Sequence, residues 1–247
     1  MSLAMHKQAN ANPLLWKLDS IATLSDEEKQ ALLELPLTIK VFGPDSDIVR
    51  DGDRPSECCL LLSGFVCRYK ILPDGSRQIM GFYIPGDIPD LQSLHLTVMD
   101  HSIGTLVTSS VALVPHESLR SCLEAHPGLA AAFWRDTLID AAMFREWMIG
   151  MGRRSANQRI AHLLCELQMR LRAVGLAGEK GYDLPVTQNE LADALGLSTV
   201  HVNRVLQDLR GEGLIVLHGG TLHIPDLEAL QAAGGFDPAY LHLKRLG

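Results

Sequence analysis

The residues best suited to chemistry in this sequence lie close together in the stretch LSTVHVNRVLQDLR, at residues 197–210. Thr199, His201, Asn203 and Arg204 fall within about one and a half turns of a helix. No acid occurs among the first eight residues after Leu197. Because these side chains can hydrogen-bond to phosphates and to base edges, the stretch is a candidate nucleic-acid contact.

The apolar residues of this stretch fix which of its side chains face solvent. They follow the spacing i, i+3, i+4, i+7 of a helix face that packs on a core. They are Val202, Val205, Leu206 and Leu209. At 100° per residue, four residues then point away from the core, with two more on the flanks. The four are Val200, Asn203, Arg204 and Gln207, and the flanking two are Thr199 and His201.

This outward face has the groups needed in a DNA major groove. Arg can bond bidentately to guanine, Asn can bond to adenine, and Val or Thr can touch a thymine methyl. The start of the helix adds unpaired N–H groups and the positive end of the helix dipole. For a lone Arg or Asn, a solvated helix on an ordinary helical domain is the better explanation. His201 in particular is as often solvated as bound.

The elements that must position this helix are also visible in the sequence. Thr187 and Glu190 have the spacing of a capping box at the start of the stretch QNELADALG. Gly196 can end that helix in the left-handed conformation, and Ser198 can cap the next one. This pattern predicts a helix-turn-helix. Thr187, Gln188 and Ser198, near helix starts, are expected to hold phosphates and to set the register on DNA.

A β-hairpin is expected directly after the second helix. The segments LIVL and TLHI flank the turn HGG, which is typical of two short antiparallel strands. His218 and the glycines at the tip could reach the DNA backbone. The capped first helix, the Gly turn, the patterned second helix and this wing together favour DNA binding over a merely solvated helix.

The region from about residue 35 to residue 114 has a different pattern. Short apolar runs such as TIKVF, CCLLLSGFVCRYKI, QIMGFYI and SIGTLVTSSVALV alternate with turn sequences rich in Gly, Pro and Asp. Several short strands at such spacing predict an antiparallel barrel or jelly roll. The fold class expected is therefore α+β.

A long helix is expected to follow, in the stretch GLAAAFWRDTLIDAAMFREWMIGM. Its apolar surface is wider than one stripe, so it must be covered on more than one side. One face can pack on the barrel, and a second copy of the same helix would cover the other, which predicts a two-fold homodimer. The alternative is a helix inside a larger single core. The expected division is a domain with the barrel at 1–126, a dimerisation helix at 127–152 and a domain with the helix-turn-helix at 153–247.

Composition limits the other classes of function. The chain has 247 residues and a net charge of −7, yet residues 153–210 carry eight basic and six acidic side chains, a net +2 that suits a polyanion. We see no signal peptide and no apolar run long enough to span a membrane, so a cytoplasmic protein is expected. The five cysteines form no CxxC pair, which argues against a zinc finger or a disulfide scaffold. No catalytic motif or clustered metal ligands appear, so we expect neither an enzyme nor a metal site.

Taken together, the C-terminal region and the predicted barrel resemble the Crp/Fnr superfamily of bacterial transcription regulators. The resemblance covers about residues 35–224 and is carried by VTQNELADALGLSTVHVNRVLQDLRGEGLI and by PDGSRQIMGFYIPGD. It implies an N-terminal jelly roll like a cyclic-nucleotide-binding domain, a long dimer helix and a C-terminal winged helix-turn-helix. It also implies double-stranded DNA as partner, with RNA polymerase as a further candidate. The base-contacting Arg of the family corresponds to Arg204, and an often acidic contact position corresponds to Val200.

The resemblance also bears on the effector, which the sequence does not identify. Members that bind cyclic AMP carry an Arg that neutralises the cyclic phosphate. Here Asp100, His101 and Ser102 occupy that region, Asp90 stands near the expected Glu, and no Arg or Lys occurs between residues 78 and 119. We therefore expect no cyclic nucleotide and no other cofactor.

Other ways of sensing are less well supported by the sequence. Cys58 and Cys59 could form a redox pair, but buried core thiols are the better explanation, and haem has no distinctive ligand spacing. The alternative function is a small-molecule sensor that acts through a protein partner, with a degenerate helix-turn-helix. A barrel enzyme of the cupin type would need clustered His and Glu ligands, and no such spacing occurs in the strands.

Overall fold

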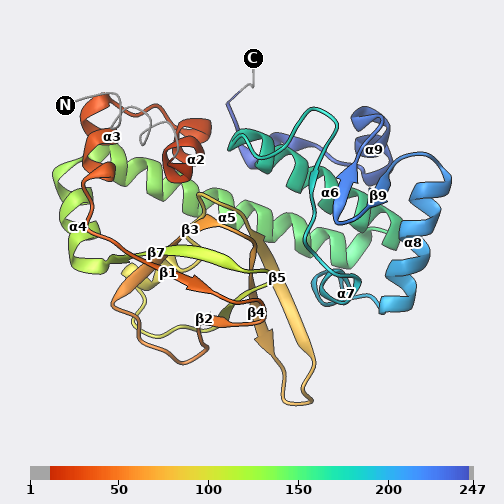
Figure 1. The fold of residues 1–247 in the computed structure, drawn as a ribbon, viewed down its shortest axis with the longest axis horizontal. Helices are drawn as coiled ribbons and strands as arrows, with labels where there is room; N and C mark the ends of the chain where they lie inside the picture. The colour runs from red at the N-terminus through yellow and green to blue at the C-terminus, as the bar shows by residue number, and fades with distance from the viewer. Residues whose placement is uncertain (1–11, 245–247) are drawn as a thin grey trace. The chain divides into compact units, whose positions relative to one another are not determined.

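The structure is a computed structural model and describes residues 12–244. These residues form two compact units. The first takes in the described residues within Met1–Arg68, Phe82–Leu138 and Lys244–Gly247, and the second takes in Tyr69–Gly81 and Ile139–Leu243. Figure 1 follows the chain from the red N-terminal helices through the strands to the blue C-terminal helices.

Two antiparallel sheets form what we call the β roll, whose residues belong to the first unit except for those within Tyr69–Gly81. One sheet has the strand order β1-β7-β3 and the other has the order β2-β6-β4-β5. The strands are β1 (Thr38–Phe42), β2 (Asp47–Val49), β3 (Glu57–Ser63), β4 (Val66–Ile71), β5 (Arg77–Tyr83), β6 (Ser102–Thr105) and β7 (Ser109–Pro115). All the apolar runs expected to be strands are strands. Both sheets contribute buried side chains to one core, among them Leu61, Val66, Ile103 and Val111.

Two N-terminal helices precede the β roll, and the sequence patterns used above did not predict them. Helix α2 (Pro13–Ile21) begins after Asn12, whose side chain accepts a hydrogen bond from the N–H of Leu14 at 3.0 Å. Helix α3 (Asp26–Leu33) begins with a capping box formed by Ser25 and Glu28. Both capping signals are present in the sequence. Helix α3 buries only Leu32, so its periodicity is weak, whereas α2 is short but buries Leu14, Leu15, Leu18 and Ile21 at helical spacing.

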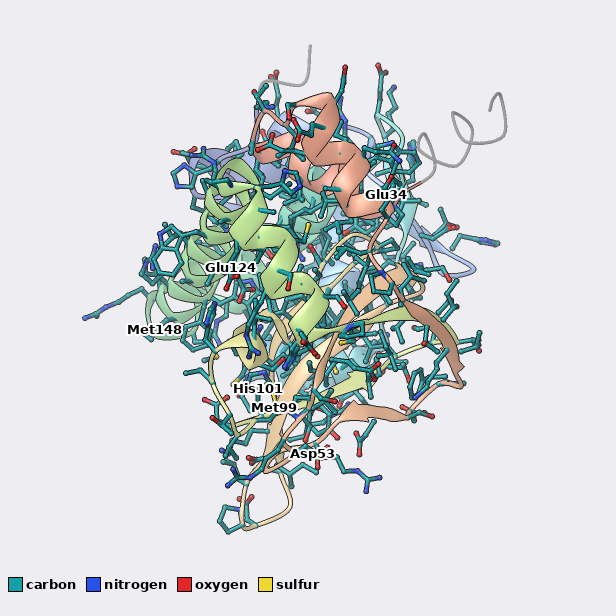
Figure 2. All side chains as sticks on the ribbon, turned by 90° about the vertical axis from the view of Figure 1, so that its left-hand side faces the viewer. Glu34, Asp53, Met99, His101, Glu124 and Met148 are labelled. Carbon is teal, nitrogen blue, oxygen red and sulfur yellow. The ribbon has the colours of Figure 1, made fainter. Side chains whose placement is uncertain are left out.

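Three helices follow the roll in sequence, and the second of them contains the long helix expected from the sequence. They are α4 (His116–Ala125), α5 (Pro127–Arg153) and α6 (Ala156–Ala173). The polar break at residues 153–155 ends α5, and Ser155 then starts α6 with a capping box to Gln158. Helix α5 exposes large apolar side chains in the single chain. They are Trp134, Leu138, Phe144, Met148 (labelled in Figure 2), Ile149 and Met151.

The second unit packs α6 against the helices and strands that follow it. These are β8 (Gly181–Asp183), α7 (Gln188–Leu195), α8 (Thr199–Gly211), β9 (Val216–His218), β10 (Thr221–His223), α9 (Leu227–Gly234) and the 3₁₀ turn η2 (Pro238–Leu241). The expected hairpin is β9–β10. It gains a third strand, in the order β8-β10-β9, from the Gly-rich segment GLAGEKGYDLP. Strand β8 has only three residues, too few to show alternation.

The C-terminal segment, α9 and η2, lies against α6 at very short range. A Cβ atom at Gly234 would come within 2.7 Å of the backbone nitrogen of His162, so only glycine fits at this crossing. Tyr240 then donates a hydrogen bond to Glu166 at 2.8 Å and contacts Nε2 of His162 at 3.1 Å. The segment thus covers a buried polar cluster on α6.

No helix within residues 12–244 is both long enough and apolar enough to cross a bilayer.

Candidate nucleic-acid interface

Helices α7 and α8 and the turn between them form the helix-turn-helix, and local hydrogen bonds define its geometry (Figure 1). Thr187 Oγ1 accepts from the N–H of Glu190 at 3.2 Å, and Glu190 Oε2 accepts from the N–H of Thr187 at 2.6 Å. Gly196 ends α7 in the left-handed region with φ 62°. Ser198 Oγ accepts from the N–H of His201 at 3.2 Å and starts α8. Each of these caps had been predicted.

Helix α8 has one buried face and one exposed face, as its periodicity indicates. Val202, Val205, Leu206 and Leu209 are at most 4% exposed. On the other side, Thr199, Asn203, Arg204 and Gln207 are exposed, and the side chain of His201 is half-buried. Val200 is 82% exposed, which is unusual for an apolar residue and leaves its methyl groups available to a partner.

The guanidinium of Arg204 projects from the middle of this exposed face. Within the part of the chain that the structure describes, it makes no hydrogen bond and no ion pair. A charged fork of N–H donors without a partner in its own chain is available for a base edge or a phosphate.

Several neighbouring polar side chains are hydrogen-bonded to one another. Thr199 Oγ1 donates to Asn189 Oδ1 at 2.8 Å. Asn203 Nδ2 donates to Gln188 Oε1 at 3.1 Å, and Gln207 Nε2 donates to Asn203 Oδ1 at 3.0 Å. Sequence reasoning missed Asn189, because a contact between two helices has no signal in the spacing of either one.

The carboxyl end of α7 is held by side chains from other parts of the second unit. Arg159 Nη1 donates to the carbonyl of Leu195 at 2.7 Å. Gln78 Nε2 donates to the carbonyl of Asp193 at 2.9 Å, and Arg77 forms an ion pair with the Asp193 carboxylate at 2.8 Å. These donors satisfy carbonyls that a helix end leaves unpaired, and the two arginines complement the helix dipole. They fix the orientation of α7, against which α8 packs.

The hairpin of the wing presents its turn to solvent. His218, Gly219 and Gly220 are exposed, and both glycines have positive φ, 58° and 84°. Thr221 Oγ1 donates to Asp183 Oδ1 at 2.9 Å and joins β10 to β8. The tip is thus a short loop without bulky side chains, of a kind that can approach a phosphate backbone closely.

Comparison with known proteins adds to this geometry. A family model described as a Crp-like helix-turn-helix domain matches residues 158–233, and one described as a cyclic nucleotide-binding domain matches residues 39–126. Nitrogen fixation regulation protein FixK of Bradyrhizobium diazoefficiens is 34% identical over 197 residues, which cover 78% of this chain and 81% of that protein.

The chain belongs to the Crp/Fnr family of transcription regulators.

Two further Crp/Fnr relatives support this assignment. Transcriptional activator protein anr of Pseudomonas aeruginosa is 28% identical, over 86% of this chain and 87% of that protein. The structure of FixK2 from Bradyrhizobium japonicum matches 81% of this chain and 98% of that chain, with a TM-score of 0.73 and 26% identity. The predicted α+β fold of β roll, long helix and winged helix-turn-helix is confirmed, and the protein is a DNA-binding transcription regulator.

One stretch of the β roll corresponds to the region where Crp/Fnr proteins that bind cyclic AMP hold the cyclic phosphate. In this protein, Asp90 of that stretch is buried and hydrogen-bonded within the chain. Asp90 is fully buried, and its Oδ1 accepts a hydrogen bond from the N–H of Cys59 at 2.8 Å. Burial raises the pKa of Asp90 to about 6. Residues 78–119 themselves contain no Arg or Lys, but a cation from outside this stretch reaches it. Arg68, from β4, donates to the carbonyl of Pro89 at 2.6 Å, and its charge offsets part of the rise in the pKa of Asp90.

The residues that replace the expected phosphate-binding Arg form a hydrogen-bonded chain. Gln92 Nε2 lies 3.1 Å from Nε2 of His101, and Nδ1 of His101 lies 2.6 Å from Asp100. Because an amide nitrogen only donates, Nε2 of His101 accepts, and Nδ1 carries the proton given to Asp100. Figure 2 labels His101 and Met99 near Asp53, whose carbonyl accepts from the N–H of Met99 at 2.9 Å. His101 is 6% exposed, so its ring belongs to the packed interior.

The two adjacent cysteines of β3 are both in the core. Cys58 and Cys59 are at most 1% exposed, since both faces of the strand are covered, and neither forms a disulfide. Burial raises the pKa of the Cys58 thiol to about 12, which leaves almost no thiolate at neutral pH. The prediction of core thiols agrees with this burial. Among the described residues, no group of three or more His, Cys, Asp and Glu side chains is placed to hold a metal ion.

Proposed function

We propose that this regulator acts as a homodimer that binds a two-fold symmetric operator through α8, without cyclic AMP as effector. The observation that carries the proposal is the exposed face of α8, where Arg204 has no partner in its own chain among the described residues. The exposed apolar side chains of α5 supply a surface that a second copy would cover. Two-fold operators present their half-sites about one turn of DNA apart, roughly 34 Å.

The roles of individual residues follow from their place on the two helices. Arg204 contacts a guanine, and Val200 contacts a thymine methyl. Thr187, Gln188 and Ser198 hold phosphates, while Thr199, His201 and Asn203 complete the contact face. The proposed domains are 1–126 for sensing, 127–152 for dimerisation and 153–247 for DNA binding.

The cellular setting follows from this function. A regulator of this kind works in the cytoplasm, where the DNA and RNA polymerase, its second proposed partner, are found. The proposed action is regulation of transcription and not enzyme catalysis.

We expect no cyclic nucleotide as effector, because the β roll has acidic side chains in the region where the cyclic phosphate would bind. A cyclic phosphate near Asp90 or Asp100 would meet an acid, and a like-charge contact at 4 Å costs on the order of 4 kcal/mol at an effective dielectric near 20. Arg68 and Arg120 are cations that reach this stretch, but they already donate to the carbonyls of Pro89 and Leu94. Another signal, of a chemical class still to be found, shifts the population of binding-competent dimers.

The test is selection of genomic DNA fragments by the purified protein, with and without cyclic AMP. We expect one palindromic site, selected equally in both conditions. Arg204→Ala should then weaken binding to that site by about 1–3 kcal/mol while the fold is retained. Arg210→Ala is the matched control, because Arg210 is an exposed arginine at the far end of the same helix.

Three results would contradict the proposal. They are the absence of any selected palindrome, a requirement for cyclic AMP, and equal affinity of Arg204→Ala and the parent protein for the selected site. Binding without a steep dependence on salt would instead favour a sensor that acts through a protein partner, because phosphate contacts release counterions.

A further inference from the structure

Three side-chain amides form a continuous hydrogen-bonded row across the helix-turn-helix. Gln207 donates to Asn203 at 3.0 Å, and Asn203 donates to Gln188 at 3.1 Å. Gln188 is the first residue of α7, whereas the other two lie one turn apart on α8. We call Gln188, Asn203 and Gln207 the amide ladder.

The amide ladder lies where a base edge would be met. Asn203 and Gln207 are exposed beside Arg204, and Gln188 is half-buried at the start of α7. No acid belongs to the ladder itself, and its neighbours on α8 are Arg204 and, one turn further along, the exposed Asp208. Exposed polar side chains are seldom held by two neighbours of their own kind, because water competes for each hydrogen bond and fixing a Gln side chain costs rotamer entropy.

Asn203 differs from the other two amides in how many of its atoms are engaged. Its nitrogen donates to Gln188 and its oxygen accepts from Gln207, so both ends of its amide have a protein partner. The bidentate contact of an amide with adenine uses the nitrogen and the oxygen together. Within the ladder, Gln188 uses only its oxygen and Gln207 uses only its nitrogen. Gln188 thus keeps its nitrogen as a donor and Gln207 keeps its oxygen as an acceptor, so the two end amides together offer the donor and the acceptor with which an A·T edge can be read.

We propose that the amide ladder acts as one specificity element, in which Asn203 positions Gln188 and Gln207, and that it selects an A·T base pair next to the guanine contacted by Arg204. The proposal rests on the proposed function, since it needs α8 in the major groove. It assigns Asn203 a different role from that of an independent base contact, and it gives Gln188 a base contact in place of the phosphate contact proposed above. Fixing the two glutamines before DNA binds removes part of the entropy cost of ordering them in the complex.

The two roles of Asn203 predict different results for combined substitutions. If each amide reads a base by itself, Gln188→Ala, Asn203→Ala and Gln207→Ala affect different positions of the operator, and their effects multiply. If the ladder acts as a unit, all three affect the same base pair, and a double substitution adds little to a single one.

The experiment is a selection from randomised half-sites with the full chain, its three single variants and the double variant Gln188→Ala/Asn203→Ala. We expect the parent to prefer A·T over G·C at the ladder position by about tenfold, which is at the lower end of the discrimination that a donor and an acceptor placed together on a base edge give. Each single variant should lose most of this preference, and the double variant should lose no more. Asn189→Ala is the matched control, because Asn189 is an exposed amide on α7 that bonds to Thr199 outside the ladder.

The possible failures are distinguishable. If the parent selects a palindrome but the three variants relax three different positions, or if their effects multiply, the ladder proposal is wrong and the proposed function stands. If the Asn189→Ala control loses the same base preference, the ladder is not the element that selects it. If the parent selects no palindrome, the proposed function itself fails. Melting temperatures of all variants should match that of the parent, since the substituted side chains lie outside the core.

Discussion

Among residues 12–244, each of the two units has one carboxylic acid that is 0% exposed, and the two acids differ in their hydrogen bonds. Glu166, on α6, accepts from Trp147 at 3.1 Å and from Tyr240 at 2.8 Å on one oxygen, and from Arg170 at 3.3 Å on the other. Asp90, in the β roll, accepts from the N–H of Cys59 on Oδ1. Its Oδ2 is buried and has no hydrogen-bond partner among residues 12–244.

Glu166 links several elements through its hydrogen bonds, whereas Asp90 has too few hydrogen bonds to replace the water it loses on burial. Burial raises the pKa of both carboxyls, but the donors around Glu166, Arg170 first, oppose the rise. Glu166 ties α5, α6 and η2 together, and its removal would leave the charge of Arg170 buried. Asp90 has fewer compensating contacts, so its negative charge is a cost to the folded β roll.

The largest expected effect is that of Glu166→Ala. Because the substitution removes one ion-pair partner of the buried Arg170 and the acceptor of Trp147 and Tyr240, we expect the free energy of unfolding to fall by about 3–5 kcal/mol. Chemical denaturation monitored by tryptophan fluorescence would measure it. The control is Glu146→Ala, which removes an acid that pairs with Arg154 in a more exposed position. A loss for Glu166→Ala no larger than that of the control would show that the two buried acids do not differ as described.

The second prediction concerns Asp90→Asn and its dependence on pH. The pKa of Asp90 is about 6 in the folded protein and 3.8 as the ordinary value. The folded state therefore binds more protons than the unfolded state between about pH 4 and pH 6, and Asp90 lowers the free energy of unfolding as pH rises through this window. The amide that the substitution introduces cannot ionise, so the variant should lack this decrease.

The size of this effect follows from the shift in the pKa. By about pH 7 the variant should be more stable than the parent by roughly 1–3 kcal/mol, with the difference developing between pH 4 and pH 6. Denaturation curves of the two proteins at several pH values would show it. If the two proteins respond to pH in parallel, Asp90 is solvated well enough to resemble a surface acid.

The smallest effect is expected for Tyr240→Phe. The substitution removes one of the hydrogen bonds to Glu166 and keeps the ring contacts with His162 and Phe236, so a loss of about 1–2 kcal/mol is expected. The measurement is again the free energy of unfolding, with Tyr69→Phe as a control outside the Glu166 cluster. A loss as large as that of Glu166→Ala would mean that Tyr240, and not the pair with Arg170, dominates the cluster.

The helix-turn-helix could be predicted from the sequence because its signals are local. The capping box of Thr187, the left-handed Gly196 and the apolar spacing on α8 all act within a few residues. The strands of the β roll were visible for the same reason. The family resemblance rests on these same stretches, so the fold and the proposed contact face were found together.

The contacts that join distant segments could not be predicted in this way. Arg68 reaches the carbonyl of Pro89 from another strand, and Tyr240 reaches Glu166 across 74 positions of the chain. The amide ladder joins two helices whose separate patterns say nothing of the pairing. Such contacts depend on where the backbone brings the segments, which periodicity and capping do not specify.

Gly234 has a practical consequence for anyone who wishes to produce the DNA-binding part alone. The region matched by the helix-turn-helix family model stops at residue 233, one position before the glycine at which α9 touches α6. A fragment cut there would lack Phe236 and Tyr240, and water would reach the acid that they cover. Extending the fragment through Leu241 retains this cover, so the useful boundary lies beyond the one that sequence comparison suggests.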